Sequence, residues 1–105
     1  MKTLILSVLD RVLLPQLLPQ QGGKIEMILC DSIARKIEFS PQEISDFGLK
    51  DDNGYVSWNK ETIRDVEYEF TPEQIEVLKN ASKKTDENRL INRQNLTLIE
   101  KIDSL

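Results

Sequence analysis

The chain has 105 residues, with 14 Lys or Arg, 18 Asp or Glu, no His and one Cys. This length suits a single domain spanning residues 1–105, because domains usually hold about 100–150 residues. The lack of His removes the commonest general base and metal ligand, and one Cys excludes an internal disulfide or a Cys-rich zinc site and gives no reason to expect secretion.

Residues 3–14 are predicted to form an amphipathic helix, because apolar residues recur at helical spacing. These are Leu4, Ile5, Val8, Leu9, Val12 and Leu13. Asp10 and Arg11 interrupt the apolar run, so neither a signal peptide nor a membrane span is expected. Pro15 lacks an amide hydrogen, and we expect the helix to stop or kink there.

A four-residue unit, Leu-Leu-Pro-Gln, occurs twice in succession. It places Leu13, Leu14, Leu17 and Leu18 beside prolines, and we expect that one small core cannot accept all four. Left exposed, they would form an apolar patch of the kind that marks association. The alternative is that they pack into the core.

The next segments are predicted to be helical. Residues 24–36 regain helical spacing and complete an N-terminal helical part, 3–37; Cys30 within it is interpreted as a buried, unreactive thiol. Ser40-Pro41-Gln42-Glu43 is a capping box that opens a short helix, and Phe47-Gly48 ends that helix.

A small sheet is predicted over residues 47–70. Asn53-Gly54 favours a tight turn that joins a strand at 55–58 to a weaker partner at 47–50. Tyr55 and Trp58 are expected to anchor the core of the sheet, with an interface role as the alternative. Residues 65–70 alternate between apolar side chains and carboxylates, so they form a third strand with one face in water.

Two C-terminal helices follow, at 72–84 and 93–103. The first opens on Thr71-Pro72-Glu73-Gln74, a second capping box. The predicted fold class is therefore α+β, with several helices packed on one small antiparallel sheet.

Acidic charge is concentrated in the middle of the chain. Residues 38–76 carry three basic and eleven acidic groups, a balance of −8, whereas the segments on either side each carry +2. Helix N-termini and a solvated sheet face explain part of this. The functional alternative is a surface for a basic partner at Asp51, Asp52, Glu67 and Glu69. Without a basic stripe interleaved with aromatic residues, direct nucleic-acid binding is not expected.

The candidate calcium-binding and catalytic motifs lack the residues that their functions require at the necessary positions. Placing Gly54 at the sixth position of a calcium loop puts Leu49 first and Lys60 twelfth, where oxygen ligands are required. A weak surface cation at Asp51 and Asp52 is the minor alternative. Glu67 and Glu69 share a strand face but lack the burial that raises the pKa of a catalytic acid. We therefore predict no enzyme activity, no cofactor and no metal site.

The chain also resembles a group of small, uncharacterised bacteriophage and prophage proteins. Those proteins open with a basic, leucine-rich helix ending in Leu-Pro, then a polar-Gly step, a second helix and a Phe-Ser cap. The matching residues here are Arg11-Val12-Leu13-Leu14, Leu18-Pro19-Gln20-Gln21-Gly22, residues 25–37, Phe39-Ser40, and later Trp58, Phe70 and Glu100-Lys101. Pro15 departs from the pattern. The resemblance implies a phage-derived protein in the host cytoplasm and supplies no catalytic residue.

These observations predict a non-enzymatic protein-interaction module. The N-terminal leucines would serve self-association or docking, and the acidic sheet face would meet a basic protein. The alternative is a minor virion or assembly component that functions as a homo-oligomer.

Overall fold

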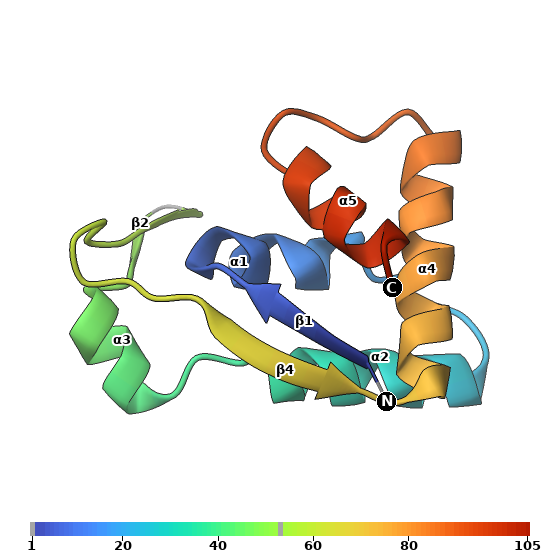
Figure 1. Cartoon of the computed structure of the whole chain (residues 1–105), viewed down its shortest axis with the longest axis horizontal. Coiled ribbons are helices and arrows are strands. Elements are labelled where there is room, and N and C mark those ends of the chain that lie inside the picture. Colours follow the sequence, from blue (N-terminus) through green and yellow to red (C-terminus); the bar gives the residue numbers. More distant parts are fainter. Residues whose placement is uncertain (1, 53) are drawn as a thin grey trace.

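The computed structural model describes residues 2–52 and 54–105, apart from the side chain of Asp52. Within these ranges the chain is α+β, as predicted, with five helices and two small antiparallel sheets (Figure 1). The elements in chain order are β1 (Lys2–Leu6), α1 (Val8–Leu17), α2 (Lys24–Lys36), α3 (Pro41–Phe47), β2 (Lys50–Asp52), β3 (Tyr55–Ser57), β4 (Val66–Phe70), α4 (Pro72–Glu87) and α5 (Leu96–Asp103).

The strands do not form the single sheet that was predicted. β4 pairs with the N-terminal β1, from Lys2 opposite Phe70 to Leu6 opposite Val66. β2 and β3 form a separate hairpin, so the partner strand is 50–52 rather than 47–50. Asn53 of the predicted turn lies outside the described residues, while Gly54 has φ of +86°, which suits glycine.

The predicted helix over residues 3–14 is wrong at its start. Ser7 caps α1. Its hydroxyl oxygen accepts a hydrogen bond from the Asp10 amide at 3.1 Å, and the Asp10 carboxylate accepts one from the Ser7 amide at 3.0 Å. This capping box fixes the first turn at Val8, so the residues before it are free to pair with β4. α1 also continues past Pro15, so the helix does not stop there.

The predicted starts of the two helices that follow capping boxes are confirmed. α3 begins after Ser40 and α4 after Thr71, each with a complete capping box. α3 ends at Gly48, whose φ of +63° is the left-handed conformation typical of a helix C-terminus. α2 has the predicted bounds, whereas α4 runs to 87 and α5 begins only at 96.

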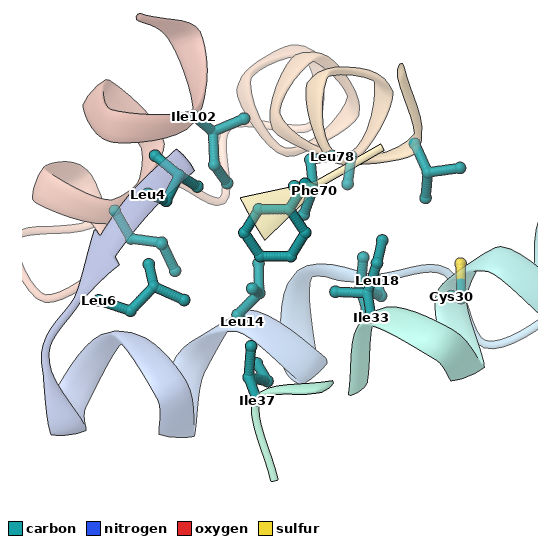
Figure 2. Packing of buried hydrophobic residues seen from close by; sticks show 13 residues of the cluster. Leu4, Leu6, Leu14, Leu18, Cys30, Ile33, Ile37, Phe70, Leu78 and Ile102 are labelled. Carbon is teal, nitrogen blue, oxygen red and sulfur yellow. The ribbon is translucent and has the colours of Figure 1, made fainter. Parts of the chain in front are cut away.

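The main core lies between the β1–β4 sheet and four helices, α1, α2, α4 and α5 (Figure 2). Leu14 and Leu18 belong to it, and Leu13 and Leu17 pack against it. Of the two alternatives for these leucines, packing into the core is the one that the structure shows, and the exposed patch is wrong. α1 lies against the core along its length, so leucines on both sides of Pro15 are accepted by the space between sheet and helices.

α3 and the β2–β3 hairpin stand to one side of this core (Figure 1). Phe47 of α3 is fully buried, beneath the Arg64 guanidinium at 5.1 Å from the ring centre. Tyr55, by contrast, is 80% exposed. The prediction that Tyr55 anchors a sheet core is wrong, and Trp58 is only partly buried. None of the described helices is long and apolar enough to cross a bilayer.

Candidate functional site

The acidic residues predicted to form one surface lie on two different sheets. Glu67 and Glu69 are exposed on β4, opposite Ile5 and Thr3, and neither forms an ion pair with another described residue. Asp51 is exposed on the hairpin. The side chain of Asp52 lies outside the described part of the chain. The structure therefore offers a small acidic face on the main sheet and a separate acidic position on the hairpin.

A more developed feature is a hollow of about 420 Å³ between α1, α3 and the hairpin, which we call the hairpin groove. Its walls come from α1, the α2–α3 connection, α3 and residues 49–56, and they are mainly apolar: Val12, Phe39, Ile44, Leu49, Lys50, Asp51 and Val56. Ile44 is 45% exposed and Val56 39% exposed. Such apolar side chains left accessible around a hollow are typical of a docking site.

A buried arginine fixes the α1 and α3 sides of the groove relative to each other. The Arg11 guanidinium of α1 donates to both carboxylate oxygens of Glu43 in α3, at 2.7 and 2.9 Å. It also donates to the backbone carbonyls of Ile37 and Glu38 at 3.0 and 3.2 Å, and it stacks on the Phe39 ring at 4.0 Å from the ring centre. One side chain thus fixes α1, the α2–α3 connection and α3 relative to one another, and these supply Val12, Phe39 and Ile44 of the groove.

The charge state of this pair is fixed at neutral pH. Hydrogen bonds from Arg11 lower the pKa of the Glu43 carboxyl from 4.5 to about 2, against the opposing effect of burial. The Ser40 amide contributes a smaller lowering. Glu43 therefore serves twice, as the second half of the α3 capping box and as the counter-ion of Arg11.

A second, larger hollow of about 600 Å³ lies next to the groove and shares Phe39 with it. Its lining is more charged than that of the groove. Arg11 is bound to Glu43, Arg35 forms a 2.8 Å ion pair with Asp31, and Glu38 forms no ion pair with another described residue. Because accessible apolar side chains favour association, the hairpin groove is the better candidate for a protein contact.

The remaining reactive groups do not form a catalytic arrangement among the described residues. Cys30 is buried, as predicted, and burial raises the pKa of its thiol, with Glu26 adding to the effect. A thiol held protonated is a poor nucleophile. The described residues contain no cluster of three or more side chains that would hold a metal ion.

Of the residues that line the groove, Asp51 was predicted as an interaction residue from the sequence, whereas the apolar ones were not. Val12, Phe39 and Val56 come from segments that are far apart along the chain, and no local pattern indicates that they meet. For Ile44 the sequence contains a weak indication of exposure. It is an apolar residue in a short helix with clear caps at both ends, and such a helix has few neighbouring residues that could cover it.

Comparisons with known proteins identify no relative of this chain. Neither the scan against protein-family models nor the searches of curated proteins and of solved structures finds a match to this chain.

Proposed function

We propose that this chain is a non-enzymatic protein-interaction module that receives apolar side chains of a partner protein in the hairpin groove. The observation that carries the proposal is the mainly apolar lining of the hairpin groove, in which Ile44 and Val56 stay 45% and 39% exposed. The Arg11–Glu43 pair fixes α1 and α3 on two sides of the groove, and those sides bind without the entropy cost of becoming ordered.

A protein partner is favoured over a small molecule because the apolar side chains of the groove wall stay accessible. Ile44 on α3 is 45% exposed and Val56 on β3 is 39% exposed. Tyr55, which is 80% exposed, precedes Val56 on the same strand and therefore faces the other side of the hairpin. Aliphatic side chains left accessible around a hollow are typical of association sites.

The acidic middle of the chain supports a basic partner. Residues 38–76, which include α3, the hairpin and β4, carry the balance of −8. Glu67 and Glu69 would provide a second contact for the same partner. The resemblance to phage proteins supports placing this interaction in the cytoplasm of a host cell, and a role in virion assembly stays the alternative.

A selection from a random peptide library on the purified protein would test the groove directly. We expect the enriched peptides to share an apolar anchor residue and to bind Val56→Asp at least about tenfold more weakly. Ile28→Asp is the matched control, because Ile28 is 57% exposed on α2 and does not line the groove. Enriched peptides that bind all three proteins equally well would contradict the proposal.

A further inference from the structure

The loop between α4 and α5 presents an apolar side chain in a basic setting. Leu90 is 64% exposed. Arg89 and Arg93 on either side are exposed, and neither forms an ion pair with another described residue. An exposed leucine between two unpaired arginines has the chemistry that the acidic, apolar hairpin groove would accept.

The backbone of this loop is held in place while the leucine side chain stays in solvent. The Leu90 amide donates to the Thr85 carbonyl at 2.9 Å, and its carbonyl accepts Asn95 Nδ2 at 3.3 Å. The Asn92 side chain accepts a hydrogen bond from the Asn95 backbone amide at 2.9 Å, and the Asn95 side chain accepts one from the Asn92 backbone amide at 2.8 Å. Arg89 has φ of +56°, a conformation that non-glycine residues adopt at a cost. Leu90 is therefore presented on an ordered loop.

The hairpin groove complements this loop in charge. Residues 38–52, which supply most of its walls, include five acidic residues and one basic residue. Glu43 is neutralised by Arg11. The groove wall itself holds one charge of each sign, Lys50 and Asp51, and neither forms an ion pair with another described residue. The net negative charge therefore belongs to the segment around the groove, whereas Leu90 lies between two arginines.

We infer that the α4–α5 loop of one copy docks in the hairpin groove of a second copy, with Leu90 as the apolar anchor. The inference rests on the proposed function, because it names the occupant of the same groove. The hairpin lies at one end of the molecule and the loop runs above α4 and α5 (Figure 1). The contact therefore joins two different surfaces, so a pair of copies keeps one free groove and one free loop. Such head-to-tail contacts build chains or rings.

Two substitutions that block the two sides separately provide the test. Val56→Asp blocks the groove and leaves the loop intact, whereas Leu90→Asp blocks the loop and leaves the groove intact. In sedimentation equilibrium we expect the mass of the unmodified protein to rise with concentration above the 12.1 kDa of a monomer. Each variant alone stays a monomer. In an equimolar mixture, the intact loop of Val56→Asp can dock in the intact groove of Leu90→Asp. This single contact gives a complex of twice the monomer mass.

Controls separate this contact from other modes of association. Ile28→Asp is expected to associate like the unmodified protein, and Arg89→Glu with Arg93→Glu is expected to lose association without touching Leu90. Raising the salt to about 1 M shortens the screening length to about 3 Å and should weaken the complex. Circular dichroism confirms that each variant is folded.

A monomeric unmodified protein at all concentrations, or a mixture of the two variants that stays monomeric, would overturn the head-to-tail contact. If the monomeric protein still binds library peptides through Val56, the proposed function stands and only the second copy is excluded as the occupant. If neither peptides nor a second copy use the groove, both proposals fall.

Discussion

Arg11 and Glu43, 32 residues apart, form a bidentate ion pair that is almost out of contact with water. The Arg11 side chain is 1% exposed and that of Glu43 is 16% exposed. The pair connects the main core, through α1, with α3 at its side. Because the same two residues fix α1 against α3, which form two sides of the hairpin groove, this contact serves both the stability of the fold and the shape of that part of the groove.

Replacing Glu43 by Gln is expected to destabilise the protein by about 3–5 kcal/mol, because it leaves a buried guanidinium without its counter-ion. Urea unfolding at pH 7 measures the loss. Asp31→Asn is the matched control: it breaks an ion pair of similar length between largely exposed side chains, for which we expect less than about 1 kcal/mol. Equal losses in the two variants would show that Arg11 does not need Glu43.

The same pair predicts how stability depends on pH. The pKa of Glu43 is 4.5 in the unfolded chain and about 2 in the folded protein, so folding favours the ionised form. This contribution is fully present above pH 4.5 and is lost as the pH falls towards 2. The difference in unfolding free energy between the unmodified protein and Glu43→Gln should therefore be constant from pH 7 to 5 and shrink between 4.5 and 2. A difference that stays constant across that interval would contradict the assigned pKa.

Arg89→Gly is expected to stabilise the fold by about 0.5–1 kcal/mol. Arg89 has φ of +56° at the end of α4, where glycine is the usual residue. Arg93→Gly removes the same charge from a position without positive φ, so it is expected to lower stability slightly. Thermal unfolding of dilute samples measures both. If the two substitutions shift the midpoint alike, backbone strain is not what distinguishes Arg89.

Short-range features of the fold could be predicted from the sequence. The caps at Ser40 and Thr71 act within four residues, so the starts of α3 and α4 follow from side-chain chemistry alone. Ser7 and Asp10 form the same device. The signal for a helix start at Val8 was therefore present, although the helical spacing of apolar residues before it favoured a longer helix.

Pairing over long distances could not be predicted in the same way. β4 alternates clearly, but nothing in residues 66–70 indicates that the partner is β1 at the other end of the chain. That pairing sets the depth of the core and so decides that Leu14 and Leu18 are buried. The hairpin groove depends on still more distant segments, because Val12 of α1 and Val56 of β3 line the same hollow.

The Cys30 thiol is expected to react slowly with an exposed-thiol reagent in the folded protein. It is 5% exposed, and burial raises its pKa, so both access and the thiolate fraction are reduced. Stopped-flow reaction with a disulfide reagent at pH 8 should be at least about tenfold slower in buffer than in urea. Equal rates would place the thiol in solvent and contradict its position in the core.

Asp10 is expected to contribute more to stability than an ordinary helix cap. Its side chain is 5% exposed, and it accepts both the Ser7 amide and Lys101 Nζ, the latter at 2.6 Å. Asp10→Ala breaks the capping box and leaves the partly buried Lys101 without its counter-ion, so we expect a loss of about 3 kcal/mol. Ser7→Ala removes only the cap and should cost about 1 kcal/mol. Urea unfolding of both variants decides the matter: if Asp10→Ala costs no more than Ser7→Ala, the ion pair between α1 and α5 contributes nothing to the fold.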